Sequence, residues 1–305
     1  MTWLLWRQHR AQAAIAAILL GAFAIPVLVT GSSLHAAFTA CRASDRCGGD
    51  LLNGYENVNT LVDLTILVPA VIGLFWGAVI VGRELETGTV ALVWTQTVTK
   101  RRWLGSKLIT LFAAALLSGA AVSGLVTWWS STRNATLESR FGGLQFDIQG
   151  VAPVGYTIFA AALGLASGVI WRRALPAMAT TVGGYIGVRM VVELFLRPHY
   201  MAPVSTLSGL SKGFGPPTGS LNVGSDILLH GRVLGGAIRM PEQCASGSSR
   251  PASDACLDRL GYQLRQTYQP AGRYWTFQWI EFGIFAALAV LLTVVAVVLL
   301  RRRDA

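Results

Sequence analysis

Six long apolar runs, separated by polar segments, form the main pattern along this 305-residue chain. The runs cover residues 11–31, 61–82, 108–129, 154–171, 176–196 and 277–300. A helix of about 20 apolar residues crosses a hydrocarbon core ~30 Å thick, and each run is close to that length. Because lipid offers no hydrogen bonds, each run must satisfy its own backbone groups as a helix. The pattern predicts an all-α integral membrane protein with six transmembrane helices.

The fourth and fifth runs are separated only by residues 172–175. Two readings stay open there: a pair of spans joined by a short turn, or a single buried hairpin. Two pairs of glycines, Gly164 with Gly168 and Gly183 with Gly187, lie four residues apart within these runs. Such spacing permits close approach of helices, and we interpret it as packing within the bundle, with contact between two copies as a weaker alternative.

Composition supports the membrane interpretation. Hydrophobic residues make up 53% of the chain, charged residues only 13%, and the mean hydropathy is +0.51. A soluble domain carries about 25% charged residues, so this chain has too little polar surface to cover a soluble core. A net charge of +10 would suggest a nucleic-acid partner in a soluble protein. Here the placement of the charge matters more, and we expect no nucleic acid.

Lysine and arginine orient the predicted spans. The short segments that share one side are 1–10, 83–107, 172–175 and 301–305. They hold twelve basic residues against three acidic ones, whereas the segments 32–60 and 130–153 hold four basic residues. Basic residues accumulate in short cytoplasmic loops. We therefore expect both termini in the cytoplasm of a multi-pass protein of the bacterial plasma membrane.

All four cysteines lie in segments placed outside by this topology: Cys41, Cys47, Cys244 and Cys256. Thiols outside the cytosol can oxidise and stay oxidised. Four cysteines allow three pairings, of which we favour the local one, Cys41 with Cys47 and Cys244 with Cys256. Free thiols are an alternative. A zinc site with His35, His199 or His230 is disfavoured, because the cysteine spacings are unlike those of short ligand pairs.

The predicted outer segment 197–276 is too long for a plain connector. Its second half predicts a helix that Ser253 or Asp254 caps and that Pro270 ends. The apolar stripe of that helix would be Leu257, Leu260, Leu264 and Tyr268. We interpret the segment as a small disulfide-containing lid over the helix bundle, or else as a solvated loop without a particular role.

Four ionisable residues lie inside predicted spans: Asp63, Arg189, Glu193 and Glu281. Such groups are costly in lipid, so they should face the bundle interior and pair. Arg189, Glu193 and Glu281 could form a polar cluster that acts as an outer gate or contacts substrate. The alternative places Asp63 and Glu281 in the hydrated interface, with Arg189 and Glu193 as a local pair on one helix face.

Segment 83–107 places seven charged groups between two apolar runs. The charged residues are Arg83, Glu84, Glu86, Lys100, Arg101, Arg102 and Lys107. Gly88 permits a bend, and an apolar patch follows at Val90, Leu92 and Val93. A short helix across the inner membrane surface would be held at both ends by spans, so force on it would tilt them.

These residues resemble a known family. Glu86-Thr87-Gly88-Thr89, followed by Thr95, Thr97, Lys100-Arg101 and Lys107, is similar to the E-x-GT…T…S/T-[KR]-R…K pattern of ABC-2 type transporter permeases. The start, 3–10, looks like the amphipathic connecting helix of actinobacterial members. The end, 268–281 with the basic tail 301–303, resembles their last span. The proline that usually follows this pattern is absent, with Thr97-Val98 in its place.

The resemblance implies a fold like that of type V exporters, with a connecting helix at 1–10, helices one to five within 11–196, and a sixth helix with a basic tail at 277–305. It also implies that 83–107 docks onto an ATPase subunit. The implied coupling residues are Glu84, Glu86, Thr87, Gly88, Thr89, Leu92, Thr95, Lys100 and Arg101.

By the same resemblance, two permease copies and two ABC ATP-binding subunits would form an exporter for a hydrophobic or amphipathic substrate. The chain contains no G-x-x-x-x-G-K-[ST] phosphate loop. We therefore expect ATP and magnesium on the partner subunit, and neither catalysis nor a cofactor on this chain. Alternatives are a membrane sensor or immunity protein without transport, and an ion-coupled secondary transporter. The latter would need internal repeats, and none is evident.

Overall fold

The computed structural model describes residues 2–43, 54–86, 100–137, 140–212, 215–234, 241–245 and 250–303, and it forms two compact units. Unit 1 comprises Met1–Glu138, Leu144–Met190 and Gln278–Ala305, and unit 2 comprises Ser139–Gly143 and Val191–Phe277. Six described helical segments are long and apolar enough to cross a membrane. They are Ala17–Ala43, Glu56–Ala78, Leu104–Ala135, Ala152–Trp171, Ala174–His199 and Ala271–Arg302. The prediction of six spans is confirmed.

The first and third spans are long helices, and the second is interrupted. Helix α1 runs from Thr2 to Ala43 without a break, so residues 2–10 belong to the same helix as the first span. Helix α6 covers Lys100–Leu137. The second span consists of α2 (Glu56–Asp63), a 3-10 turn (Leu64–Leu67), α3 (Val68–Ile72), a π-helical turn (Gly73–Ala78) and α4 (Val79–Glu86).

Proline explains the first of these interruptions. Pro69 lies in the first turn of α3, where its missing N–H costs nothing, but the preceding residues cannot form regular α-helical bonds to it. The chain therefore tightens into the 3-10 turn just before α3.

The last three spans follow after a short helix. Helix α7 (Gly143–Ile148) precedes α8 (Ala152–Trp171), which ends where Arg172 adopts a left-handed conformation with φ 51°. Helix α9 (Ala174–Val191) continues as a π turn (Val192–Leu196) and a 3-10 turn (Arg197–His199). A 3-10 turn (Ala271–Arg273) leads into α12 (Tyr274–Arg303). The fourth and fifth runs are thus two separate helices.

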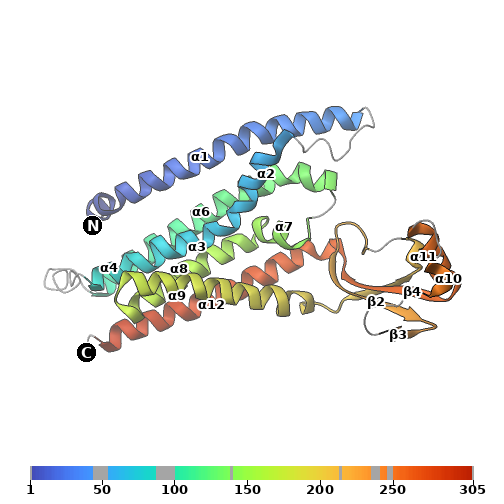
Figure 1. Cartoon of the computed structure of the whole chain (residues 1–305). Helices are drawn as coiled ribbons and strands as arrows, with labels where there is room; N and C mark the ends of the chain where they lie inside the picture. The colour runs from blue at the N-terminus through green and yellow to red at the C-terminus, as the bar shows by residue number, and fades with distance from the viewer. Residues whose placement is uncertain are drawn as a thin grey trace. The chain divides into compact units, whose positions relative to one another are not determined.

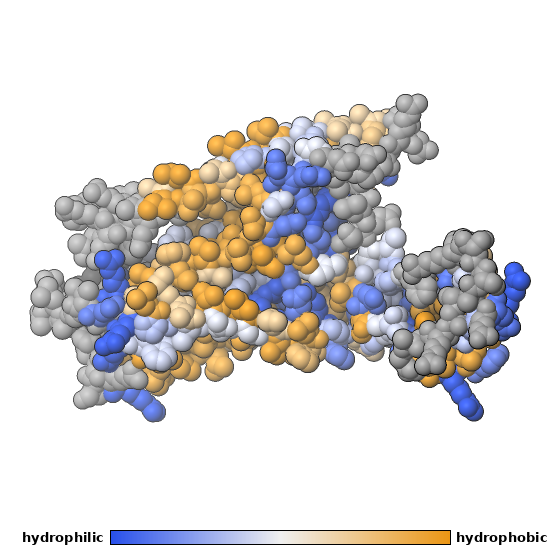
Figure 2. Space-filling model, viewed as in Figure 1, coloured by the Kyte–Doolittle hydropathy of each residue, from blue (hydrophilic) through white to orange (hydrophobic). Residues whose placement is uncertain are grey.

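Helix α8 is the central helix of unit 1. Its apolar window is 78% buried, whereas those of the other five spans are 17–39% buried. It packs against α3, the π turn, α4 and α6. One apolar core joins Ile72, Leu111, Leu165 and Ala296, and a second joins Val27, Val62, Val126 and Trp129. Apolar side chains also cover much of the visible face of these helices (Figure 2), as expected for surfaces that meet lipid.

Several helix ends of unit 1 lie together. The start of α1, the end of α4 and the end of α12 lie at the same end of this unit, which we call the terminal end (Figure 1). Arg172, Arg173, Arg301 and Arg302 are exposed. The segment between α4 and α6 therefore leaves and re-enters the helix bundle where the chain also begins and finishes.

Unit 2 contains an antiparallel four-stranded sheet with the order β1-β4-β2-β3. The strands are β1 (Val204–Ser208), β2 (Leu221–Leu229), β3 (Arg232–Leu234) and β4 (Tyr262–Gln269). A two-residue turn, His230-Gly231, joins β2 to β3, with φ 48° and 80° as such hairpins require. Other elements are a 3-10 turn (Leu210–Lys212), α10 (Glu242–Ala245) and α11 (Arg250–Arg259).

The helix predicted over Leu257, Leu260, Leu264 and Tyr268 is wrong in its second half. Helix α11 ends at Arg259, and Gly261 has φ 83°, which terminates helices. Residues 262–269 then pair with two strands instead. Leu264 and Tyr268 are both buried. They are four residues apart, a spacing that fits one face of a strand as well as one face of a helix.

Candidate functional site

A buried cluster of charged and polar side chains lies in unit 1. Arg189 on α9 places Nη2 2.7 Å from Asp147 Oδ2 on α7, and Nη1 3.2 Å from Glu281 Oε1 on α12. Tyr156 on α8 contacts both Arg189 and Glu281, and we call these four residues the ion cluster. The exposed fractions are 6% for Arg189, 3% for Asp147, 0% for Glu281 and 1% for Tyr156. Burial of ionised groups in a membrane is costly unless they pair, and this pairing involves four helices.

Tyr156 makes two kinds of contact in the ion cluster. Its hydroxyl donates a hydrogen bond to Glu281 Oε1 at 2.7 Å. Its ring lies under the guanidinium of Arg189, with 3.9 Å between Cζ and the ring centroid. This is cation–π geometry. The tyrosine therefore stabilises both ion partners, the anion through its hydroxyl and the cation through its ring.

Gln278 fixes the helix that carries Asp147. Its side chain donates to the carbonyl oxygen of Phe146 at 2.9 Å and accepts from the backbone N–H of Ala152 at 2.8 Å. Phe146 and Ile148, which flank Asp147, are buried. One fully buried glutamine on α12 thus bonds to both sides of the α7–α8 connection, so that Asp147 is held facing Arg189.

The sequence predicted part of this cluster. Arg189 and Glu281 are brought together, but Glu193 is not a member. The expected local pair of Arg189 with Glu193 is not formed, because the π turn at Val192–Leu196 breaks the regular helical spacing on which that pairing depended. Glu193 instead lies 3.9 Å from Arg197 Nη1 and is 38% exposed at its side chain.

Asp147 and Tyr156 are the site residues that sequence reasoning missed. Asp147 was assigned to a connecting segment outside the spans. One signal was present: Leu144, Phe146 and Ile148 surround it in a short apolar stretch. A carboxylate within such a stretch, in a chain that must compensate a buried Arg189, is a candidate partner.

The alternative prediction placed Asp63 and Glu281 in the hydrated membrane interface, and it is wrong for Glu281. Glu281 is fully buried, so it is not hydrated at the interface. Asp63 is 27% exposed at its side chain and lies 3.2 Å from Arg133 Nη1. The same guanidinium nitrogen donates to Asn59 Oδ1. Asp63 therefore forms a one-to-one ion pair between α2 and α6.

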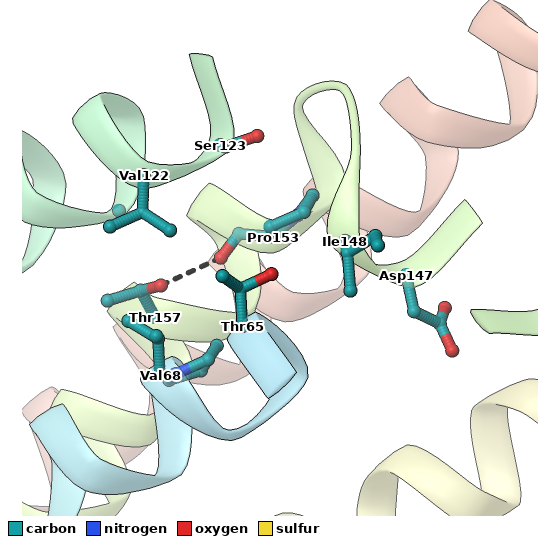
Figure 3. Close-up of a pocket in the computed structure, with 10 residues that line it drawn as sticks. Thr65, Val68, Val122, Ser123, Asp147, Ile148, Pro153 and Thr157 are labelled. Atoms are coloured by element: carbon teal, nitrogen blue, oxygen red, sulfur yellow. Dashed lines mark hydrogen bonds between the residues drawn. The ribbon is translucent and has the colours of Figure 1, made fainter. Parts of the chain in front are cut away.

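A small pocket adjoins the ion cluster. Segments from the second span, α6, α7 and α8 line it, and Figure 3 shows hydroxyl groups of Thr65, Ser123 and Thr157 around it. Its volume is ≈ 10 Å³, room for about one water molecule. Asp147 lines this pocket, but its carboxylate points away from these hydroxyl groups (Figure 3) and pairs with Arg189.

At the terminal end, the second span and α8 touch through their backbones. A Cβ atom added at Gly77 would lie 2.6 Å from Ala161 O and 3.0 Å from Gly164 Cα. One added at Gly168 would lie 2.9 Å from Ala78 O. Glycine is required where helices approach this closely. Gly164 and Gly168 therefore pack within the bundle, whereas Gly183 and Gly187 have nothing within 4 Å.

Glu86, one of the predicted coupling residues, contacts the start of α9. Its Oε2 accepts a hydrogen bond from the backbone N–H of Ala174 at 3.1 Å. A carboxylate at a helix N-terminus satisfies a free N–H and favours the helix dipole. Glu84 lies in α4, and Lys100 and Arg101 begin α6. Thr87, Gly88, Thr89, Leu92 and Thr95 lie outside the described residues.

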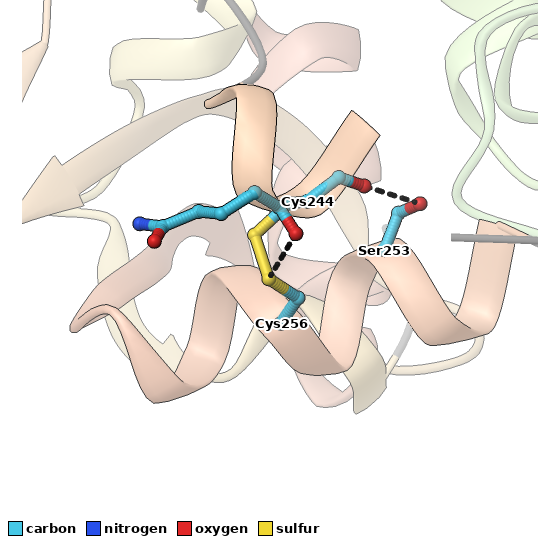
Figure 4. Close-up of a disulfide and its surroundings, with 4 residues drawn as sticks. Cys244, Ser253 and Cys256 are labelled. Carbon is cyan, nitrogen blue, oxygen red and sulfur yellow. Dashed lines mark hydrogen bonds between the residues drawn. A yellow bond between two sulfur atoms is a disulfide. The ribbon is translucent and has the colours of Figure 1, made fainter. Parts of the chain in front are cut away.

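One of the two predicted disulfides is present. Cys244 and Cys256 join α10 to α11 with a Cα–Cα distance of 5.6 Å (Figure 4). The Ser253 hydroxyl donates a hydrogen bond to the carbonyl oxygen of Cys244 at 3.2 Å. Ser253 therefore links α10 to α11 and does not form the predicted N-terminal cap, because α11 already begins at Arg250. Cys41 is disulfide-bonded, and Cys47 lies outside the described residues. Within the described part of the chain, no group of three metal-ligating side chains occurs.

Comparison with known proteins adds one finding. The family model described as ABC-2 membrane transporter related matches residues 14–197, more than half of the chain. This range includes most of α1, the second span, α6, α8 and α9, and it contains three members of the ion cluster. Neither a curated protein nor a solved structure matches the chain.

Proposed function

Because the chain belongs to the ABC-2 membrane transporter related family, we propose that it is the permease subunit of an exporter whose ATP hydrolysis takes place on a separate subunit. The family assignment and the six apolar helices make it a multi-pass membrane protein of the ABC-2 type. Export of a hydrophobic or amphipathic substrate, and the ATP-binding subunit as motor, form the proposed part.

The observation that carries this proposal is the position of the segment between α4 and α6. The end of α4 and the start of α6, which flank this segment, lie at the terminal end with both ends of the chain (Figure 1). The exposed arginines of this end favour a cytoplasmic location by the distribution of basic residues in membrane proteins. A soluble ATPase would therefore reach segment 83–107 from the cytoplasm.

The contact between the second span and α8 suggests how motion would spread. Gly73, Gly77 and Gly168 leave no space for side chains between these helices. A shift of α4 would therefore move α8, which carries Tyr156 of the ion cluster. Arg189 and Glu281 would then respond as a gate, in agreement with their position across three spans.

The partners follow from the same proposal. A second permease copy, or a homologous one, would complete the pathway, with two ATP-binding subunits as motors. Large apolar side chains remain exposed on α1 and α12, among them Ile18, Leu19, Val290 and Leu291. These surfaces face lipid or the second permease. ATP and magnesium would bind to the motor subunits.

A crosslinking experiment tests the proposal. A photoreactive amino acid at Leu92 of the full chain, coexpressed with the candidate ATP-binding subunit, should yield a crosslink to that subunit in membranes. The matched control is the same amino acid at Leu207, an exposed residue of β1 in unit 2. A crosslink from position 207 but not from 92 would reverse the orientation and overturn the proposal.

Activity of the reconstituted complex gives a second readout. Lys100→Ala with Arg101→Ala should weaken ATPase binding, whereas Arg301→Ala with Arg302→Ala removes equal charge from the same end and should not. Glu281→Gln should stop export while ATP hydrolysis continues. If ATP hydrolysis responds to candidate substrates but no substrate crosses the membrane, the sensor interpretation replaces export.

A further inference from the structure

The turn between α8 and α9 carries two arginines next to an exposed apolar surface. Arg172 and Arg173 directly follow Trp171, the last residue of α8, and all three side chains are exposed. Leu175, in the first turn of α9, is 80% exposed. Tryptophan is enriched at the level of the lipid headgroups. A basic pair therefore lies where the apolar surface of two spans meets the membrane boundary.

Arg172 occupies a backbone conformation that does not favour arginine. Its φ is 51°, and its N–H donates a hydrogen bond to the carbonyl oxygen of Gly168 at 3.0 Å, which ends α8. Glycine, and less often asparagine, occupies such left-handed positions, whereas other L residues are sterically disfavoured there. The backbone therefore gives no reason for a long cationic side chain at position 172. Such an outlier points to a role of the side chain itself.

The charge of this turn is not neutralised by ion pairs. Within the part of the chain that the structure describes, neither Arg172 nor Arg173 forms an ion pair or a side-chain hydrogen bond. Glu86, which contacts the same turn, accepts from the backbone N–H of Ala174 instead. Two guanidinium groups thus keep their donors for an external partner. A guanidinium binds phosphate through two parallel hydrogen bonds, which makes phosphate a suitable partner.

The end of α12 adds positive charge to the same region. Arg301 and Arg302 are exposed, and Leu300 belongs to one apolar core with Val169 of α8. The ends of α8 and α12 therefore lie close together in unit 1. Hydrophilic residues gather at this end of the visible face, next to the apolar surface of the spans (Figure 2). Arg301 and Arg302 raise the local concentration of anions without contacting the same phosphate as the turn.

We propose that the α8–α9 turn binds the headgroup of an anionic phospholipid, with Arg172 and Arg173 contacting its phosphate. Trp171, Arg172, Arg173 and Leu175 form what we call the lipid site. Trp171 lies at the level of the headgroup, and Leu175 contacts the acyl chains. A lipid fits better than a soluble phosphate compound, because the exposed apolar side chains directly adjoin the arginines. This inference depends neither on the exported substrate nor on the ATP-binding subunit.

Fluorescence quenching of the purified full chain in lipid nanodiscs tests the proposal. A bimane label on Leu175→Cys reports on the lipid site, and the same label on Val290→Cys is the matched reporter, since Val290 is a 65% exposed residue of α12. Brominated phosphatidylglycerol is titrated into phosphatidylcholine. Quenching at position 175 should saturate at a low fraction of phosphatidylglycerol, whereas quenching at 290 should rise in proportion to that fraction. Equal curves at the two positions would overturn the proposal, and this comparison needs no arginine variant.

Arginine variants separate a lipid site from general attraction by charge. Arg172→Asn with Arg173→Gln removes both charges, and asparagine tolerates the left-handed conformation. The phosphatidylglycerol fraction at half-maximal quenching should rise at least roughly fivefold, the contribution of one basic group near an anionic surface. Arg7→Gln with Arg10→Gln removes equal charge at the start of α1, at the same end, and should leave that fraction nearly unchanged. An equal rise in both variants would contradict a site at the turn.

Two other outcomes would identify a different ligand. Sodium phosphate that reverses the quenching more strongly than sodium chloride of equal ionic strength would indicate a soluble phosphate compound. If Arg172→Asn with Arg173→Gln weakens binding of the ATP-binding subunit and leaves the lipid titration unchanged, the two arginines belong to a protein interface. Either result overturns the lipid site. The function proposed above is tested separately, by the crosslink at Leu92.

Discussion

Arg189 Nη2 and Asp147 Oδ2 lie 2.7 Å apart, an ion pair between α9 and α7 that buries both side chains. Glu281, the second anionic partner of Arg189, lies on α12. These three groups join segments that are far apart in the sequence. The stability of unit 1 should therefore depend on the arginine more than on either carboxylate alone.

Arg189→Met should destabilise the protein by about 3–5 kcal/mol, because it leaves two buried carboxylates without their cation. Asp147→Asn should cost less, since Arg189 and Glu281 remain as a one-to-one pair. Thermal or chemical unfolding in detergent would measure both. The control is Arg265→Met in unit 2, whose pair with Asp226 is 37% and 44% exposed and should contribute about 0–1 kcal/mol. Equal losses in the two arginine variants would contradict a special role of Arg189.

Gly77→Ala should destabilise the second span, whereas Gly183→Ala should not. The new methyl group at Gly77 would meet the backbone of Ala161 at 2.6 Å, and backbone cannot give way as a flexible side chain can. Overpacking of this kind costs about 1–3 kcal/mol. Gly183 has open space around it, so alanine there tests helix propensity alone. Unfolding midpoints in detergent compare the two, and similar values would show that the helices are not locked together.

Glu86 variants separate two roles of one side chain. If Glu86 acts through the N-terminus of α9, Glu86→Gln should keep most of the function, because an amide oxygen still accepts from Ala174. Glu86→Ala should lose the cap, at a cost of about 0.5–2 kcal/mol. ATP hydrolysis by the reconstituted complex and its unfolding midpoint are the two readouts. Equal impairment of ATPase coupling in both variants, with stability unchanged in Glu86→Gln, would instead assign Glu86 to charge recognition by the partner.

Cys244→Ser with Cys256→Ser should loosen unit 2. The disulfide spans a sequence separation of 12, and bridges of this kind contribute roughly 2–4 kcal/mol. Limited proteolysis should then cut between α10 and the start of β4 while the spans stay protected by detergent. Ser253→Ala, which removes only the hydrogen bond to Cys244 O, should have a smaller effect of about 1 kcal/mol.

Single introduced cysteines can show which side of the membrane unit 2 and the C-terminal end of α12 face. The described cysteines are all in disulfides, so Ser205→Cys and Arg302→Cys add defined thiols at exposed positions of unit 2 and of the C-terminal end of α12. In intact cells a membrane-impermeant maleimide should label position 205 and not 302. Permeabilised cells should allow labelling of both. Labelling of 302 alone in intact cells would place the terminal end outside.

Most of the helical architecture could be predicted from the sequence, because a span is a local property of about 20 residues. The apolar runs gave six helices, and the short turn at Arg172 separated the fourth from the fifth. Unit 2 could not be predicted in the same way. Its sheet depends on pairing of β4 with β1 and β2, strands distant in sequence, and Leu264 and Tyr268 fit two periodicities equally well.

The ion cluster shows the same limit. Arg189 and Glu281 were recognisable because a charge within an apolar run stands out. Asp147 was hidden in a connecting segment, and its surroundings include groups distant in sequence, namely Arg189 on α9 and, through bonds to the adjacent backbone, Gln278 on α12. The choice between Glu193 and Asp147 as the partner of Arg189 rests on a π turn that no residue pattern announced.

The enclosure of α8 constrains how the protein is made. A helix with so little surface for lipid is poorly suited to the bilayer until its neighbours surround it. Among those neighbours, α12 is synthesised last. Until then Tyr156, Asp147 and Arg189 lack the carboxylate and the glutamine that complete their bonding. The incomplete bundle must therefore be protected during biogenesis. A nascent chain that stops short of α12 would expose these polar groups to the quality-control proteases of the membrane.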